Sequence, residues 1–295
     1  MLFERQRLLL TLLDLLDGPV GNTDFQKLLL FYTQECEKTP SYEFVPYKFG
    51  GFSFTSYADE RKLTKAGLLT EHDQQWELTK RGQQMAREHP VLPLRVTRFC
   101  RNYATLRGGA LIAEQYRKYP YYATRSEIVD KLSLEPEAQA RIAAARPKKS
   151  QPGLCTIGYE GKSLENYLNQ LLRAGVTLLC DVRRNPLSRK YGFSKSTLRK
   201  ACEGVGIRYE HLPELGIASE ERRDVKTQAD YDALFATYER NELPKQKAVL
   251  EKISSWIEQG ERVALTCYEA QPHQCHRHCV SEAVEHITLK VATHL

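Results

Sequence analysis

The chain has 295 residues, of which 41% are hydrophobic and 27% are charged, and its formal net charge is +6. This length and apolar content suffice for two domains with hydrophobic cores. There is no run of about 18 uncharged apolar residues and no signal peptide, and the eight cysteines are too widely spread for a secreted disulfide scaffold, so we expect a cytoplasmic protein with no membrane partner.

The N-terminal part has the pattern of a helical module that ends in a hairpin. Apolar residues at helical intervals predict helices over residues 5–16, after the caps Asn22 and Thr23, and over residues 56–65. Residues 68–70 and 76–78 are short apolar segments that can pair across the polar turn between them. Three helices followed by a hairpin have the outline of a winged helix-turn-helix.

Two segments of this module resemble a known family. Residues 25–31 and 44–53 are similar to the helix and the "pYkyGpfs" signature of Panacea-type, SocA-like antitoxin domains, with Gly51 where that pattern often has proline. The resemblance covers residues 1–130 and implies a winged-helix-like module for contact with a partner protein, and by analogy toxin–antitoxin or phage-defence biology. Residues 1–90 carry 11 Lys and Arg against 13 Asp and Glu, which disfavours contact with duplex DNA.

Positive charge is concentrated after this acidic segment. Residues 91–150 carry 12 Lys and Arg against five Asp and Glu, which leaves DNA contact open for this region. A polar stretch rich in proline and lysine at residues 146–153, which follows a helix-like segment, predicts a domain boundary. We therefore assign residues 1–130 to a winged-helix-like interaction domain, 131–153 to a basic linker and 154–295 to an α/β domain.

Strand and helix patterns alternate after this boundary. Residues 177–182 are mostly apolar without alternation, as in strands that are covered on both faces. The pattern predicts a Rossmann-like α/β fold with an open, mostly parallel sheet and helices on both sides. The expected strands are residues 154–157, 177–182, 208–212 and 262–266, and the expected helices are residues 163–174, 194–203 and 279–287.

Polar motifs follow the ends of these predicted strands. Because the carboxyl ends of parallel strands meet at one edge of a sheet, we expect the motifs to converge on a ligand site. The motifs are Gly-Tyr-Glu-Gly at 158–161, Asp-Val-Arg-Arg-Asn-Pro at 181–186, Leu-Pro-Glu-Leu-Gly at 212–216, Cys-Tyr-Glu at 267–269 and Cys-His-Arg at 275–277. Their order resembles the domain of unknown function family 488 over residues 154–286, which implies a Rossmann-like fold with a shared polar site and no established reaction.

Asp181 and Arg183 are candidates for substrate contact, because side chains two residues apart at a strand end project to the same side. The guanidinium can clamp a phosphate, or the two groups can pair with each other and order the loop. Residues 181–200 carry seven Lys and Arg against one Asp, which predicts an anionic partner unless these cations form a solvated helix face. Ser188 and Lys190 would add donors to the same anion.

Cys275 and His276 lie at the predicted start of the last helix, where backbone amides and the helix dipole favour a thiolate or an anion. Cys275 is either a nucleophile whose thiolate is flanked by His276 and Arg277, or a small buried hydrophobic residue while Arg277 alone meets the ligand. Together with Cys267, these two residues also offer ligands for zinc, although their spacing is not that of a standard finger.

Glu160 and Glu269 follow neighbouring strands and provide two carboxylates. Such a pair can act as nucleophile and general acid in cleavage or transfer at a glycosidic carbon, or each can hydrogen-bond a loop amide.

These residues predict an α/β domain that binds an anionic nucleotide or nucleic acid and hydrolyses or transfers it. The alternative is a non-catalytic ligand sensor that acts through the N-terminal module. The candidate catalytic residues are Glu160, Asp181, Glu269, Cys275 and His276; the candidate ligand-binding residues are Tyr159, Arg183, Arg184, Ser188, Lys190, Tyr209 and Arg277; the alternative metal ligands are Cys267, Cys275 and His276.

Overall fold

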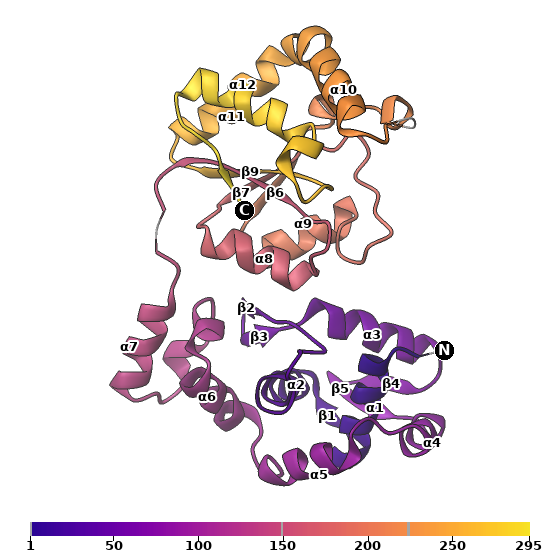
Figure 1. The fold of residues 1–295 in the computed structure, drawn as a ribbon. Helices are drawn as coiled ribbons and strands as arrows, with labels where there is room; N and C mark the ends of the chain where they lie inside the picture. Colours follow the sequence, from indigo (N-terminus) through magenta and orange to yellow (C-terminus); the bar gives the residue numbers. More distant parts are fainter. Residues whose placement is uncertain (1, 149, 223–224) are drawn as a thin grey trace. The chain divides into compact units, whose positions relative to one another are not determined.

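The computed structural model describes residues 2–148, 150–222 and 225–295. The chain divides into two compact units, Met1–Arg146 and Pro147–Leu295 (Figure 1). Of the helices that the described residues form, none combines the length and the apolar composition needed to cross a lipid bilayer.

The N-terminal unit is mainly α-helical and contains a small antiparallel sheet of order β1-β5-β4. The predicted helices and hairpin are present, and β1 adds a third strand by pairing with β5. A second hairpin, β2–β3, lies between α2 and α3. The elements are α1 (Glu4–Leu16), β1 (Val20–Gly21), α2 (Asn22–Cys36), β2 (Val45–Tyr47), β3 (Gly50–Phe52), α3 (Phe54–Lys65), β4 (Leu69–His72), β5 (Gln75–Leu78), α4 (Lys80–Glu88), α5 (Pro93–Asn102), α6 (Gly108–Lys118) and α7 (Pro136–Ala145).

Helix α7 differs from the sequence-based prediction, which assigned residues 131–153 to a linker. The helix buries Ala138 and Ile142, four residues apart on one face, in a cluster with Ile112 and Ala113 of α6. The linker prediction was based on charge and proline content. The boundary between the two units falls between Arg146 and Pro147, so α7 belongs to the N-terminal unit, and Lys149 lies outside the described residues.

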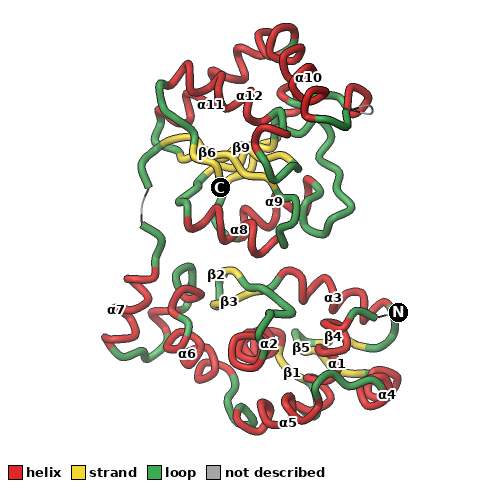
Figure 2. The backbone as a smooth tube through the Cα atoms, in the orientation of Figure 1, coloured by secondary structure: helices red, strands yellow, loops and turns green. Residues whose placement is uncertain are grey.

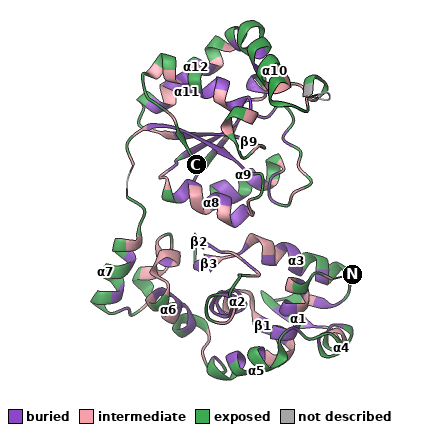
Figure 3. Cartoon of the chain, viewed as in Figure 1, coloured by how far each residue is buried: buried purple, intermediate pink, exposed green. Residues whose placement is uncertain are grey.

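The C-terminal unit contains a five-stranded sheet of order β10-β6-β9-β7-β8, in which every pairing is parallel. This confirms the Rossmann-like α/β prediction. Every residue of β6 and β7 is buried, which explains the apolar runs without alternation (Figure 3). The strands are β6 (Gly153–Gly158), β7 (Leu178–Asp181), β8 (Arg208–His211), β9 (Arg262–Cys267) and β10 (Thr293–His294).

Helices cover both faces of this sheet. In Figures 1 and 2, α8 and α9 lie on one face, and α11 and α12 lie on the other. The N-cap Ser163 begins α8 by accepting a hydrogen bond from the amide of Asn166. The sequence analysis did not predict α10, α11 or β10. The helices are α8 (Leu164–Arg173), α9 (Lys195–Gly204), α10 (Gln228–Asn241), α11 (Lys247–Glu258) and α12 (Arg277–Thr288).

Candidate functional site

The polar motifs meet at the carboxyl edge of the parallel sheet. Gly158 at the end of β6 pairs in register with Cys267 at the end of β9, and Asp181 at the end of β7 pairs with Thr266. The loops that follow β6, β7 and β9 therefore leave the sheet side by side, as the sequence predicted.

Two glycines allow these loops to approach one another closely. A Cβ atom at Gly158 would overlap the backbone carbonyl oxygen of Glu269, and one at Gly216 would overlap the backbone nitrogen of Arg184. Both positions therefore require the absence of a side chain. These contacts hold the loop after β9 against β6, and hold the turn after β8 against the cationic loop after β7.

Asp181 lies at the centre of a buried hydrogen-bond network. Arg183 donates to it from Nε over 2.8 Å and also from Nη2, and the Tyr209 hydroxyl donates to Oδ2 over 2.6 Å. The remaining guanidinium nitrogen of Arg183, Nη1, donates to the Tyr159 hydroxyl and to the carbonyl of Phe193, both over 2.9 Å. The Tyr159 ring stacks on Phe193 with ring centroids 4.3 Å apart.

This network places Asp181 and Arg183 in the second of the two predicted roles, in which they pair with each other. Asp181 is 0% exposed and Arg183 is 6% exposed. Burial opposes the charge of Arg183, but the hydrogen bond and the negative charge of Asp181 outweigh burial and raise the pKa of Arg183. Burial, followed by the charge of Asp181, likewise raises the pKa of Tyr209. Tyr209 is held by its hydrogen bond to Asp181, and it does not line the pocket described below.

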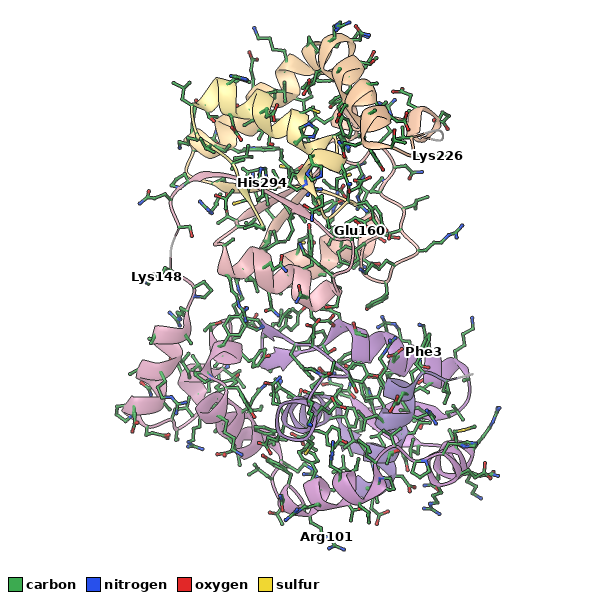
Figure 4. The ribbon with its side chains drawn as sticks, viewed as in Figure 1. Phe3, Arg101, Lys148, Glu160, Lys226 and His294 are labelled. Carbon is green, nitrogen blue, oxygen red and sulfur yellow. The ribbon has the colours of Figure 1, made fainter. Side chains whose placement is uncertain are left out.

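Arg277 and Glu160 both brace the loop after β9. Arg277 is 1% exposed and donates to the backbone carbonyls of Glu269 and Ala270. Glu160, labelled in Figure 4, is exposed and accepts a hydrogen bond from the Ala270 amide over 2.9 Å. Arg277 was predicted to contact the ligand. In the structure its guanidinium is instead buried under the loop after β9 and bonded to the backbone of that loop. The structure also favours the loop-amide role for Glu160 over the catalytic one.

Cys267, Cys275 and His276 form a compact buried group. Cys267 Sγ lies 3.4 Å from Glu269 Oε2 and 3.7 Å from His276 Nδ1, and the ligand atoms of all three residues lie within 4.8 Å of one another. Burial, together with a hydrogen bond to Cys267, raises the pKa of the Cys275 thiol well above its usual value. A raised pKa opposes the thiolate form of a cysteine. Burial therefore disfavours Cys275 as a free nucleophile.

A pocket of about 320 Å³ opens beside this group. The predicted residues Tyr159, Arg183, Arg184, Ser188, Cys267 and His276 line it, and Asn185, Leu187, Arg189, Ile217 and Tyr268 complete the lining. The other predicted site residues lie outside this lining, namely Glu160, Asp181, Lys190, Tyr209, Glu269, Cys275 and Arg277.

Two of the lining residues that the prediction missed had a signal in the sequence. Arg189 belongs to the cationic segment 181–200, and Tyr268 lies between Cys267 and Glu269 in the last strand-end motif. Lys190, which was predicted to bind the ligand, instead donates to the carbonyl of Tyr159 over 3.1 Å.

Comparison with known proteins identifies the C-terminal unit. Residues 163–284 match the family model described as the domain of unknown function DUF488. Searches of curated proteins and of solved structures give no match. The matched residues lie outside the N-terminal unit, whose resemblance to Panacea-type domains stays a prediction. With its parallel sheet and its strand-end motifs, the C-terminal domain of this chain belongs to the DUF488 family.

Proposed function

We propose that the C-terminal domain binds an anionic nucleotide or nucleic-acid strand in the pocket at the carboxyl edge of the sheet. The observation that carries the proposal is a pair of exposed guanidinium groups, Arg184 and Arg189, in the lining of one pocket. Within the described part of the chain, no ion pair engages either group. Unlike Arg183, whose charge is neutralised by Asp181, they remain available for a phosphate, and a planar guanidinium can hold it through two parallel hydrogen bonds.

An aromatic side chain at the same pocket supports a ligand that carries a nucleobase. Tyr268 lines the pocket, is 45% exposed, and packs edge-on against the buried ring of Tyr159 with centroids 5.3 Å apart. A positioned aromatic ring beside cationic groups is the arrangement that stacks a base while its phosphate is held. A volume of about 320 Å³ is also within the usual range for small-ligand sites.

Ligand titration of the full chain tests this proposal. We would measure the affinity for AMP and for a short single-stranded oligonucleotide in wild type, in Arg184→Ala and in Arg189→Ala. Arg240→Ala is the matched control, because Arg240 is an exposed arginine on α10 that does not line the pocket. Hydrogen bonds to charged groups contribute about 1.5–3 kcal/mol, so each pocket variant should weaken binding by roughly tenfold to a hundredfold.

The salt dependence of oligonucleotide binding gives a second measure. Loss of one phosphate contact to a single strand should reduce the magnitude of the slope of log affinity against log salt by about 0.7, whereas Arg240→Ala should leave it unchanged. Equal affinity in all four proteins would contradict the proposal.

The same experiment separates catalysis from sensing. Asp181 and Arg183 are occupied with each other, which favours the non-catalytic sensor as the second candidate function. Mass spectrometry of the nucleotide after incubation with the protein would show new products if the domain is a hydrolase or transferase. Binding with an unchanged nucleotide would favour the sensor.

A further inference from the structure

The buried group Cys267, Cys275 and His276 has the composition of a transition-metal site. Cys267 ends β9, and Cys275 and His276 immediately precede α12, so the end of a strand and the start of a helix bring the ligand atoms together. All three side chains are at most 1% exposed. Two soft sulfur ligands and one imidazole at mutual distances within 4.8 Å suit zinc better than magnesium or calcium, which prefer oxygen ligands.

The orientation of His276 is set by the backbone of the loop after β7. His276 Nε2 lies 3.0 Å from the carbonyl oxygen of Val182, which can only accept, so this nitrogen carries the proton. Nδ1 is then the basic nitrogen, and it faces Cys267 Sγ. A ring nitrogen that donates to a backbone carbonyl is the usual second contact of a metal-ligating histidine, because it fixes the tautomer and the ring plane.

The spacing of the ligand atoms agrees with tetrahedral coordination. Zinc lies about 2.3 Å from sulfur and about 2.0–2.1 Å from nitrogen, which places the sulfur and the nitrogen about 3.6 Å apart at a tetrahedral angle. Cys267 Sγ and His276 Nδ1 are 3.7 Å apart. An ion can therefore enter with little movement of these two side chains.

We propose that Cys267, Cys275 and His276 bind one zinc ion whose fourth coordination position faces the anion pocket. Cys267 and His276 line that pocket, whereas Cys275 is fully buried outside the lining. Three protein ligands with one open position characterise zinc sites that hold water or a substrate. The identity of the fourth ligand, a phosphate oxygen or a water molecule, rests on the proposed function, but the three-residue site does not.

The chain offers a matched control. Cys279 on α12 is also buried, and it forms a second metal-capable group with Glu239 and His278. Glu239 is exposed and this group does not line the pocket. Cys279→Ser therefore removes a buried thiol from the same helical region while leaving the proposed ligands in place.

Metal content of the full chain tests the site. The protein would be stripped with a chelator, reloaded with zinc, desalted and measured by plasma mass spectrometry, with circular dichroism as the check on folding. We expect one zinc per chain in wild type and in Cys279→Ser, and background levels in Cys267→Ser and Cys275→Ser. Wild type without zinc, or loss of zinc in Cys279→Ser alone, would overturn the proposal.

Cobalt substitution gives a readout that needs no variant to fold. Co²⁺ in the wild-type chain should produce a thiolate-to-cobalt charge-transfer band and the intense visible bands of tetrahedral cobalt, and absence of the charge-transfer band would refute cysteine ligation. Addition of AMP or inorganic phosphate should then shift the visible bands if the fourth position is open to the pocket. An unchanged spectrum in a sample that binds AMP would overturn the open position. AMP binding is measured separately, so failure of the anion pocket and failure of the metal site remain distinguishable.

Discussion

Lys27 in the N-terminal unit should make the stability of that unit depend on pH. The residue is 2% exposed, and its ammonium group donates to the carbonyl of Gly51 over 3.0 Å. Burial lowers the pKa of Lys27 from 10.5 to about 7, and the nearby charge of Asp24 offsets only part of this effect. We predict that Lys27→Met reduces the pH dependence of unfolding.

The sign follows from proton binding. The pKa of Lys27 is about 7 in the folded state and about 10.5 in the unfolded state, so between these pH values the unfolded state binds more protons. Stability therefore rises with pH across this window, and the penalty for the buried charge is fully present below pH 7.

The magnitude follows from the same pKa difference. One pKa unit corresponds to about 1.4 kcal/mol, so the penalty is about 4 kcal/mol at pH 7 and about 2 kcal/mol at pH 9. The variant also leaves the Gly51 carbonyl without this donor, at a cost of about 1–3 kcal/mol that does not depend on pH.

Urea unfolding at several pH values provides the assay. The chain has two tryptophans, and a Trp256→Phe background leaves Trp76, which is buried in the N-terminal core, as the reporter of this unit. The difference in unfolding free energy between Lys27→Met and its parent should fall by about 2 kcal/mol from pH 7 to pH 9. Lys38→Met, at an exposed lysine, should show a difference that does not change with pH. A constant difference for Lys27→Met as well would refute a lowered pKa for Lys27.

Three further predictions concern the C-terminal unit. Asp181→Asn should destabilise the C-terminal unit by about 3–5 kcal/mol, because the buried guanidinium of Arg183 loses its counter-charge. Urea unfolding followed by the fluorescence of Trp256 in a Trp76→Phe background measures this loss, and a loss below about 1 kcal/mol would contradict the prediction. Tyr209→Phe removes one hydroxyl donor to the same carboxylate and should cost only about 1–2 kcal/mol in that assay, so a loss equal to that of Asp181→Asn would argue against the ion pair as the main contribution. Gly158→Ala should displace the loop after β9 and weaken AMP binding, whereas Gly153→Ala, whose added Cβ meets only ordinary contacts, should bind AMP as wild type does; equal affinity in both would disprove the close approach.

Much of the fold could be predicted from local patterns. Strands β6, β7 and β9 of the C-terminal sheet are buried over most of their length and appear in the sequence as largely apolar segments, and helix α8 has a serine cap followed by apolar residues at helical spacing. β10 could not be predicted, because its two exposed residues form a strand only by pairing with β6. The assignment of helix α7 to a linker has a related reason, since its two buried residues gain their partners from α6.

The sequence by itself determined the family of the C-terminal domain, the parallel sheet and the set of polar residues at its carboxyl edge, because these depend on residue order and on strand direction. Only the tertiary structure decided what each residue does there. Asp181 accepts a hydrogen bond from Tyr209, which lies 28 residues away in the sequence. Arg277 donates to a backbone carbonyl of the loop after β9, which can pack against β6 because Gly158 has no side chain. Burial and hydrogen-bond partners are properties of segments brought together by folding, so motif membership alone could not separate the loop braces from the residues that line the pocket.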